Sequence, residues 1–292
     1  MTPFDQPGVV RLALPKGRMQ AEVLALLDAA GLRVRAGARE YRPTIAAGAF
    51  NVKVLKPQNI VEMLAGDSRD IGFAGADWVA ELEADVVELL DTGLDPVRLV
   101  AAAPNDLLEG GELRCRENLV VASEYPRLTG AWIDRSELGA RLVRSYGATE
   151  VFPPDDADLI VDNTATGATL AANGLTIIDT LMSSSTRLYA NPRALDDPAR
   201  CRAIQDVTIL LASVLEARQR VMCEVNVCAE RLEAVCAILP CMREPTVSLL
   251  HGGAGYAIKA AVPRASLPKL VPLIKATGGS DIVITALTQL VQ

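Results

Sequence analysis

The sequence predicts an α/β protein with two lobes and a separate C-terminal domain, and three observations support this. Apolar runs alternate with segments of helical periodicity, which is typical of a sheet covered by helices. A polar stretch over 104–116 marks a crossing into a second lobe, and an amphipathic helix over 198–219 is expected to return to the first. The residues after 219 follow the order β-α-β-β-α-β.

The first lobe is predicted to hold strands over 9–14, 52–55, 70–74 and 98–103. A charged loop, Pro15-Lys16-Gly17-Arg18, follows the first strand and leads into a helix that stops at Gly31. Asn59 is the predicted N-cap of the helix after the second strand, and Asp77 stands where the third strand gives way to the next helix. Because ligands of parallel sheets bind where strands end and helices begin, these loops are candidate binding positions.

The second lobe is predicted to begin with a strand over 119–122 and a helix from about Thr129 to Tyr146. Strands over 149–152 and 158–161 follow, and then a loop rich in threonine and glycine. The last strand before the long helix is predicted over 187–190.

The C-terminal domain follows the split-βαβ, ferredoxin-like order. We expect strands over 221–227, 246–250, 256–262 and 281–287, with helices over 231–239 and 266–276. The predicted domains are therefore a first lobe of residues 1–103 with 183–219, a second lobe of residues 104–182, and a C-terminal domain of residues 220–292.

Composition excludes several classes of function. Lys and Arg total 29 against 36 Asp and Glu, and the net charge of −7 disfavours nucleic acid and anionic membranes as partners. Charged residues interrupt every long apolar run, and the N-terminal residues 1–8 do not look like an export signal, so we expect a cytoplasmic protein. The six cysteines form no Cys-x-x-Cys pair, which favours reduced core thiols over a metal site.

The stretch 157–170 predicts a phosphate-binding loop. A buried strand ends at Asp162, and small residues with threonines at 164, 166 and 169 and a glycine at 167 lead into a helix. Small side chains let backbone amides approach an anion, and threonine hydroxyls add donors. Asp162 would repel a close phosphate and suits ribose hydroxyls or a bound Mg²⁺. Taken alone, the stretch is equally consistent with a turn that caps a helix.

Several motifs together resemble one enzyme family. The acid at a strand end followed by Thr-Gly-x-Thr resembles the loop that holds phosphoribosyl pyrophosphate (PRPP) in phosphoribosyltransferases. The chain is similar to the ATP phosphoribosyltransferase family through further motifs at Leu12–Arg18, Asp70–Asp77, Glu150-x-x-Pro153 and Arg187–Pro192. The resemblance runs essentially end to end and includes the regulatory domain of the long form, through Val225-Asn226-Val227 and Pro245–Ser248.

The resemblance implies a fold and a reaction. It implies a catalytic part of two lobes, like that of periplasmic binding proteins, followed by the ferredoxin-like regulatory domain. The reaction is the first step of histidine biosynthesis, in which N1 of the adenine of ATP displaces pyrophosphate from PRPP with Mg²⁺ as cofactor. Such a transfer depends on positioning and charge stabilisation, so no Ser-His or Cys-His nucleophile is required. The sole histidine, His251, is expected to be a surface residue.

The resemblance also implies site residues. It assigns catalysis to Lys16, Arg18, Glu150 and Asp162. It assigns PRPP to Lys56, Asp162, Thr164, Ala165, Thr166, Gly167, Ala168, Thr169 and Leu170, with Asp162 also holding Mg²⁺ through the substrate. It assigns ATP to Lys16, Gly17, Arg18 and Asp77.

The residues alone leave alternatives open at four of these positions. Lys16 and Arg18 are also consistent with a solvated turn, Asp77 with a helix cap, and Glu150 with a surface ion pair. Lys56 and Asn59 depart from the Arg-x-x-Asp-Ile pattern that the family often shows, which places details of the pyrophosphate site in doubt.

The family binds histidine as a feedback inhibitor between neighbouring copies, and its long form assembles into hexamers with dimers as intermediates. Asn226, Thr246 and Ser280 occupy the matching places, although they are also ordinary turn and strand-edge residues. Two alternatives to the enzyme are a solute-binding protein with a two-lobed cleft and a non-catalytic paralogue. A solute receptor would need an export signal and would not need a phosphate loop opposite Lys16 and Arg18.

Overall fold

The computed structural model describes residues 8–35 and 41–291. The chain divides into two compact units, Met1–Asp28 with Leu32–Gln205 and Ala29–Gly31 with Asp206–Gln292. Residues 1–7, on which the expectation of no export signal largely rests, lie outside the described residues. Among the helices of the described ranges, none is long and apolar enough to span a membrane.

The first unit is built on one eight-stranded sheet with the strand order β10-β9-β11-β6-β12-β5-β1-β4. Its strands are β1 Val10–Pro15, β4 Phe50–Leu55, β5 Ile71–Gly75, β6 Val87–Pro104, β9 Glu117–Ser123, β10 Gly139–Arg144, β11 Leu159–Thr164 and β12 Leu175–Ala190. Two short ladders pair β2 (Val34–Arg35) with β3 (Thr44–Ile45), and β7 (Leu108–Glu109) with β8 (Glu112–Leu113).

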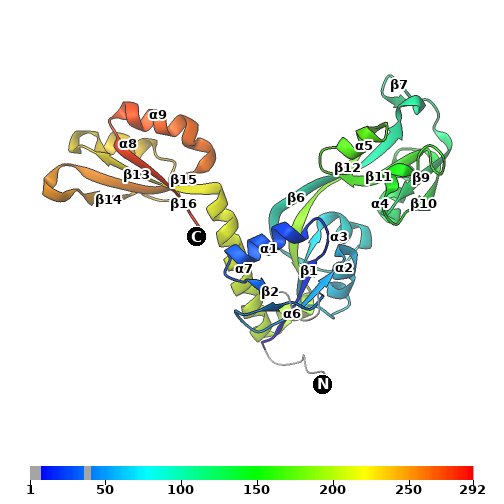
Figure 1. Cartoon of the computed structure of the whole chain (residues 1–292), viewed down its shortest axis with the longest axis horizontal. Coiled ribbons are helices and arrows are strands. Elements are labelled where there is room, and N and C mark those ends of the chain that lie inside the picture. The colour runs from blue at the N-terminus through cyan, green and yellow to red at the C-terminus, as the bar shows by residue number, and fades with distance from the viewer. Residues whose placement is uncertain (1–7, 36–40, 292) are drawn as a thin grey trace. The chain divides into compact units, whose positions relative to one another are not determined.

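Strands β6 and β12 run antiparallel through the centre of the sheet and join its two halves (Figure 1). We call β4, β1 and β5 with their helices the proximal half, and β11, β9 and β10 with theirs the distal half. The prediction that the helix over 198–219 makes the return crossing is wrong. Strand β12 makes it, because this strand pairs with β6 along its length and then with β5 over 186–190.

Both central strands are longer than predicted, since only 98–103 and 187–190 were recognisable as strands. Residues 87–97 are largely exposed or half-buried, and repeated register shifts interrupt the pairing of β12 with β6. Neither segment therefore carries the continuous or strictly alternating apolar pattern that marks a strand in a sequence.

The helices of the proximal half are α1 Gln20–Ala29, α2 Pro57–Ala65 and α3 Ala76–Leu82. The prediction that Asn59 caps α2 is wrong, because the helix begins at Pro57 with Lys56 as its N-cap. Proline fixes φ at a helical value and needs no amide partner, so it starts a helix readily. Asn59 lies inside the first turn and donates to Glu62 at 3.2 Å.

In the distal half the predicted helix from Thr129 to Tyr146 is wrong in its second part. Helix α4 covers only Pro126–Arg135, and residues 139–144 form the edge strand β10, which pairs with β9. Glu137, with a φ of +52°, ends the helical path. The predicted strand over 149–152 is instead the 3₁₀ turn Thr149–Val151, since Gly147 and Ala148 both have positive φ and reverse the chain.

The sheet of the first unit has a core on each face. One core joins both halves, with buried residues from α2, α3 and α4 packed against alternate residues of the strands, such as Leu99 and Ala101. The other contains Val100, Ala102 and Leu170, the last from helix α5, Ala168–Ala172. The short helix α6, Pro192–Asp196, follows β12, and α7, Pro198–Gln219, contains the boundary between the units.

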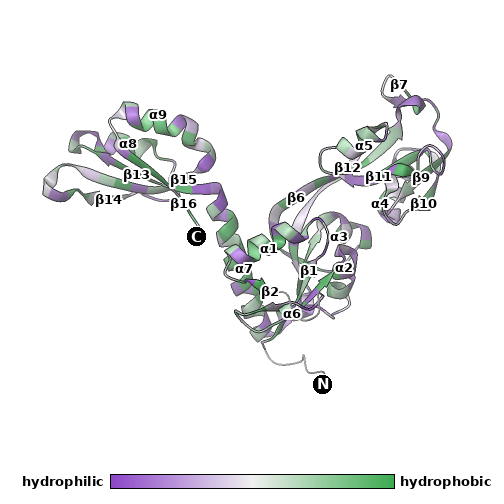
Figure 2. Cartoon of the chain, viewed as in Figure 1, coloured by the Kyte–Doolittle hydropathy of each residue, from purple (hydrophilic) through white to green (hydrophobic). Residues whose placement is uncertain are grey.

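The second unit has the predicted β-α-β-β-α-β order, with the antiparallel sheet order β14-β15-β13-β16. Its elements are β13 Arg220–Val227, α8 Leu232–Ile238, β14 Thr246–Leu249, β15 Tyr256–Pro263, α9 Leu267–Thr277 and β16 Ser280–Ala286. Each lies within about two residues of its prediction, and the ferredoxin-like prediction is confirmed. Its core is formed by residues of β13 and β15 together with residues of α8 and α9, and Figure 2 shows hydrophobic residues on both strands and helices.

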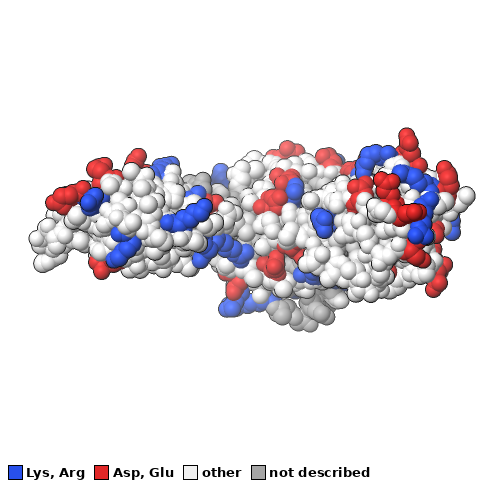
Figure 3. Space-filling model, turned by 90° about the horizontal axis from the view of Figure 1, so that it is seen from above, with Lys and Arg blue, Asp and Glu red and all other residues white. Residues whose placement is uncertain are grey.

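The cysteines and the histidine follow the sequence expectations in part. All six cysteines are free, but only Cys223 is fully buried, while Cys115 and Cys228 are exposed. No cluster of metal-binding side chains is found within residues 8–35 and 41–291. His251 is exposed on a 3₁₀ turn between β14 and β15, as predicted. Acidic and basic side chains are interspersed on the face shown in Figure 3.

Candidate active site

The loop between β11 and α5 carries the predicted phosphate-binding residues. Gly167 has a φ of +81°, and an added Cβ would meet only Ile177, at 3.5 Å. The backbone angle, not lack of space, therefore requires glycine here. The hydroxyls of Thr164 and Thr166 accept hydrogen bonds from the amides of Gly167 and Ala168 at 2.9 and 3.3 Å, which hold the loop in shape.

This loop forms a wall of a cavity of about 300 Å³. Glu150 reaches the cavity from the 3₁₀ turn and Arg18 from the loop after β1 in the proximal half. The other lining residues are Asp162, Asn163, Thr164, Ala165, Thr166, Ala168, Thr169 and Leu170. The cavity therefore offers hydroxyls, amides and a guanidinium to an anion, with two carboxylates beside them.

The surroundings of Asp162 disfavour the charged form of its carboxyl group. Burial raises its pKa to about 6, although the backbone amide of Asn163 donates to it at 2.7 Å and opposes the rise. The negative charges of Glu124 and Glu150 raise it further. Hydroxyl donors or a cation in the cavity would stabilise the charged form of this group.

A second cavity, of about 170 Å³, shares Arg18 and Asn163 with the first. It brings together Lys16, Arg18 and Asp77, three of the four residues predicted for ATP. Gly17 belongs to the same loop and is exposed. The remaining lining residues are Met19, Pro57, Gln58, Gly75, Trp78, Asp95, Val97, Glu124, Ser184, Ser185 and Thr186.

Asp77 is buried and forms hydrogen bonds to the distal half and to the central strand β12. Its Oδ2 accepts from the hydroxyl of Tyr125 at 2.6 Å, and its Oδ1 accepts from the hydroxyl of Ser184 at 2.7 Å. The side-chain amide of Asn163 donates to the same Tyr125 hydroxyl at 2.8 Å. The alternative that Asp77 caps its helix is wrong, because Gly75 is the N-cap of α3 and the Asp77 side chain turns toward Tyr125.

Two basic side chains of the loop after β1 are held by neighbours. Arg18 donates to Oδ1 of Asp95 at 2.7 Å, and burial raises the pKa of Asp95 against the effect of this arginine. The other oxygen of Asp95 is buried without a hydrogen-bond partner. The Lys16 ammonium lies 5.7 Å from the centre of the Tyr41 ring. The loop is thus exposed at Gly17 and Arg18, but both of its basic side chains contact neighbouring residues.

Lys56 and Glu150 complete the predicted set. Lys56 is exposed, directly before the cavity residue Pro57, and its charge acts on Glu124. It lines neither cavity. Glu150 forms no ion pair with any described residue, which goes against the surface ion-pair alternative.

Sequence reasoning missed the cavity residues Glu124 and Ser184, and also the buried Tyr125, which donates a hydrogen bond to Asp77. Glu124 and Tyr125 directly follow β9, so the rule that ligands lie beyond the ends of parallel strands identifies them once this strand is recognised. Ser184 lies within β12, and its partner Asp77 is 107 positions away, so no local pattern indicates the contact.

The three predicted histidine-binding residues lie in two separate places on the second unit's sheet. Asn226 and Ser280 pair between β13 and β16, and both contact the carboxylate of Asp281, at 3.2 and 3.1 Å. Thr246 lies on β14, at the opposite edge, paired with Lys259. Within one chain, the structure therefore brings together two of the three.

Comparison with known proteins identifies relatives of both units. A family model described as ATP phosphoribosyltransferase matches residues 56–212, and one described as HisG, C-terminal domain, matches residues 217–289. The ATP phosphoribosyltransferase of Pelotomaculum thermopropionicum is 34% identical over 289 residues, which cover 97% of this chain and 99% of that protein. The enzyme of the same name from Desulforudis audaxviator is 34% identical over 279 residues, with 94% and 96% covered.

A solved structure supports the fold. The ATP phosphoribosyl transferase (HisG:HisZ) complex from Thermotoga maritima matches with a TM-score of 0.60 at 24% identity, covering 70% of this chain and 98% of that chain. This likeness confirms the predicted two-lobed fold class. Because the family models match both units and the relatives match nearly the whole length, the chain belongs to the ATP phosphoribosyltransferase family, in its long form with a C-terminal domain.

Proposed function

We propose that the two adjoining cavities are where this enzyme transfers phosphoribosyl from PRPP to N1 of the adenine of ATP and releases pyrophosphate. The 300 Å³ cavity would take PRPP and the 170 Å³ cavity the adenine of ATP. The observation that carries the assignment is the phosphate loop opening onto the same space as Asp162 and Arg18.

The residues of the first cavity suit PRPP. The loop residues 164–170 offer hydroxyls and amides to the 5′-phosphate, and Asp162 suits the ribose hydroxyls. Glu150 lies on the same opening and would stabilise positive charge as it develops on the ribose. Arg18, which lines both cavities, would stabilise the departing pyrophosphate together with Lys16.

The residues of the second cavity suit the nucleotide. Trp78 lines it and stacks on Tyr125 with ring centres 4.5 Å apart, which gives an aromatic surface for a base. Lys16 and Arg18 supply positive charge for the triphosphate. The work of these groups is to hold N1 and the ribose carbon in line, which lowers the barrier without a covalent intermediate.

Mg²⁺ fits the donor set of the first cavity when it arrives with the substrate. Asp162 and Glu150 supply hard oxygen donors. Burial, and to a smaller extent the charges of Glu124 and Glu150, raise the pKa of Asp162, and a bound cation would offset both effects. Since no protein cluster of three such donors occurs in the described ranges, substrate oxygens would complete the coordination. The ion would neutralise charge on the phosphates of PRPP.

The test is direct. Purified protein is mixed with ATP, PRPP, Mg²⁺ and a pyrophosphatase, and the near-ultraviolet absorbance of the N1-substituted adenine is followed. We expect a rise that requires all three ligands. A flat trace with PRPP binding confirmed by calorimetry would indicate the non-catalytic paralogue instead, an alternative that the family matches do not favour.

We further propose histidine inhibition through Asn226, Thr246 and Ser280, assembly into hexamers, and a cytoplasmic location. The separation of Thr246, on the edge strand β14, from Asn226 and Ser280 is compatible with a histidine site shared by neighbouring copies. Truncation after Gln219 should leave a folded first unit that no longer responds to histidine. The inhibition proposal fails if millimolar histidine changes neither the activity nor the melting temperature of the full chain.

A further inference from the structure

The reaction proposed above produces a proton that needs an acceptor. When N1 of adenine bonds to the ribose carbon, the ring gains a positive charge, and this charge makes the exocyclic amine at N6 acidic. Loss of one N6 proton gives the neutral product. A carboxylate beside the adenine would remove this proton as the bond forms, provided that the carboxylate is not already engaged.

Three carboxylates line the 170 Å³ cavity, namely Asp77, Asp95 and Glu124. Both oxygens of Asp77 already accept hydrogen bonds, from Tyr125 and Ser184, and this side chain is buried. One oxygen of Asp95 is paired with Arg18 at 2.7 Å, and the other, which has no partner, is buried away from the cavity surface. Two of the three carboxylates therefore have structural partners and are poor candidates.

Glu124 is the carboxylate without a partner. It forms no hydrogen bond or ion pair with another residue of the described ranges, and its side chain is half-buried at the end of β9. The charged groups that act on it come from three elements: Lys56 before α2, Arg144 at the end of β10 and Asp162 on β11. Burial raises the pKa of Glu124, while Lys56 and Arg144 oppose the rise.

We propose that Glu124 is the general base that removes the N6 proton of adenine during the transfer. The inference rests on the proposed function, which places ATP in this cavity. The N1 lone pair forms the bond to the ribose carbon, and the bonding pair to the pyrophosphate oxygen leaves with pyrophosphate. The N6 proton moves to a carboxylate oxygen of Glu124, which later releases it to solvent.

The surroundings of Glu124 suit both directions of this step. A carboxyl group with a raised pKa holds a proton closer to neutral pH than an exposed one does. In the reverse direction, the protonated Glu124 would return the proton to N6 as the bond to N1 breaks. Glu150 and Asp162 line the other cavity, beside the phosphate loop, where they would interact with the ribose and the cation.

The test compares the full-length wild type with Glu124→Gln and with the matched control Glu117→Gln. Glu117 is an exposed glutamate at the opposite end of the same strand. We expect Glu124→Gln to lower kcat about 100-fold at pH 7 with little change in the KM for ATP or PRPP. The difference in kcat between Glu124→Gln and the wild type should become smaller as pH rises, because the acidic amine then loses its proton to solvent. Glu117→Gln should match the wild type.

A second variant separates catalysis from folding. In Glu124→Ala, added formate should restore part of kcat, because a small carboxylate can take the vacated position. A Glu124→Gln enzyme with kcat within about threefold of the wild type would overturn the inference and leave the proposed function standing. A deficit that is constant with pH and insensitive to formate would also overturn it. If the wild type itself forms no product, the proposed function fails first and the inference falls with it.

Discussion

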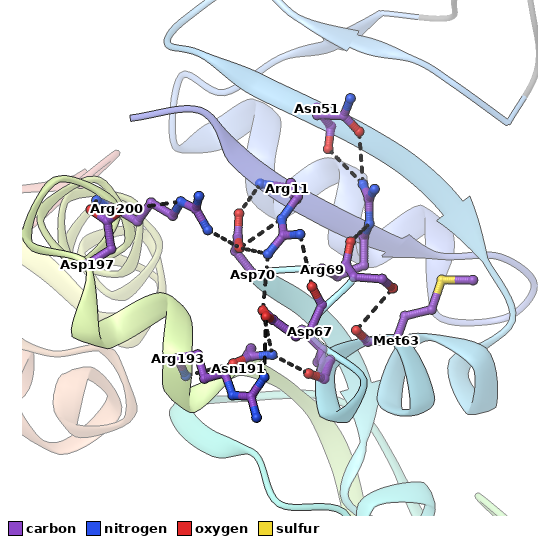
Figure 4. A network of polar contacts seen from close by, with 12 residues as sticks. Arg11, Asn51, Met63, Asp67, Arg69, Asp70, Asn191, Arg193, Asp197 and Arg200 are labelled. Carbon is purple, nitrogen blue, oxygen red and sulfur yellow. Dashed lines mark hydrogen bonds and ion pairs between the residues drawn. The ribbon is translucent and has the colours of Figure 1, made fainter. Parts of the chain in front are cut away.

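Strand β1 has a polar cluster at each end, and the two clusters differ in how their charges are used. Near its start, Arg11 forms ion pairs with Asp67 and Asp70. Asp67 also pairs with Arg193, and Asp70 also pairs with Arg200 (Figure 4). We call these five residues with Asn191 the anchor cluster. Beyond the end of β1, the residues of the two cavities form the cavity cluster.

The anchor cluster pairs its own charges. Asp70 is fully buried and accepts from the Arg11 side chain at 2.6 and 3.0 Å, with Arg200 of helix α7 at 3.5 Å. Asn191 donates to the backbone oxygen of Leu64 at 2.6 Å and to Asp67. The cluster thereby joins β1, the loop between α2 and β5, the residues after β12 and the start of α7, and its role is structural.

The cavity cluster leaves charges unpaired. Glu124 has no partner among the described residues, one oxygen of Asp95 is buried without a hydrogen bond, and burial raises the pKa of Asp162. Polar groups held at such a cost are typical of sites that await a ligand. The comparison therefore predicts that substitutions in the anchor cluster reduce stability, whereas substitutions of the unpaired carboxylates in the cavity cluster reduce activity and can increase stability.

The largest expected effect is on the anchor cluster. Asp70→Asn keeps the shape but leaves Arg11 and Arg200 beside a neutral group, which should lower the free energy of unfolding by about 3–5 kcal/mol. Urea denaturation measures this. Asp67→Asn is the control, because the Asp67 side chain is 40% exposed. This substitution should lower the free energy of unfolding by at most about 1 kcal/mol. Equal losses in the two variants would contradict the structural role of Asp70.

The opposite sign is expected for Asp162→Asn. The folded-state pKa of about 6 lies above the ordinary value of 3.8, so the folded state holds the proton more tightly than the unfolded chain does. The contribution of Asp162 to the free energy of unfolding is therefore most favourable below about pH 4, and it is lost as pH rises through 6. At pH 8 the variant should be more stable by up to about 3 kcal/mol and transfer more slowly. At pH 4 its stability should match the wild type.

The control for this pH dependence is Asp155→Asn, which changes an exposed carboxyl group of the same half of the sheet. Its free energy of unfolding should differ from that of the wild type by no more than about 0.5 kcal/mol at either pH. If Asp162→Asn is less stable than the wild type at pH 8, Asp162 belongs with the paired carboxylates of the anchor cluster.

Next in size is the effect of Gly167→Val on ligand binding. A β-branched residue cannot easily adopt the φ of +81°, so the loop must move, and PRPP affinity should fall about 100-fold by calorimetry. Gly174→Val is the matched control, because Gly174 has a similar φ of +71° at the other end of α5, with open space around it. Equal PRPP affinity in the two variants would remove the loop from the site.

The regular parts of the fold were predictable from the sequence. In the second unit, alternating residues such as Val221, Cys223 and Val225 mark β13, and every element was located within about two residues. In the first unit, Glu137 and Ala148 adopt positive φ, which a helical or strand-like pattern does not reveal, so β10 and the turn at Glu150 were missed. Strands β6 and β12 were predicted too short because register shifts in their pairing break their periodicity.

The residues of the candidate site were predictable only where they lie at or directly after the end of one strand. Lys16, Arg18, Asp77 and the loop after Asp162 each follow a strand, and the structure brings them to two adjoining cavities. The contacts among Asp77, Tyr125 and Ser184 join segments 48 and 107 positions apart, so only the folded sheet shows them. The raised pKa of Asp162 likewise depends on burial, which no local pattern gives.

The smallest expected effect concerns a neighbouring pair on β12. Ser184 is buried and bonds both the carboxylate and the amide of Asp77, whereas Ser185 is half-buried and donates to Asp91. Ser184→Ala leaves an oxygen of Asp77 buried without its donor and should cost about 1–3 kcal/mol, while Ser185→Ala should cost about 0.5 kcal/mol or less. Because Asp77 lines the cavity, Ser184→Ala should also raise the KM for ATP. A loss of stability without any change in KM would assign Asp77 to the structural framework instead of the ATP cavity.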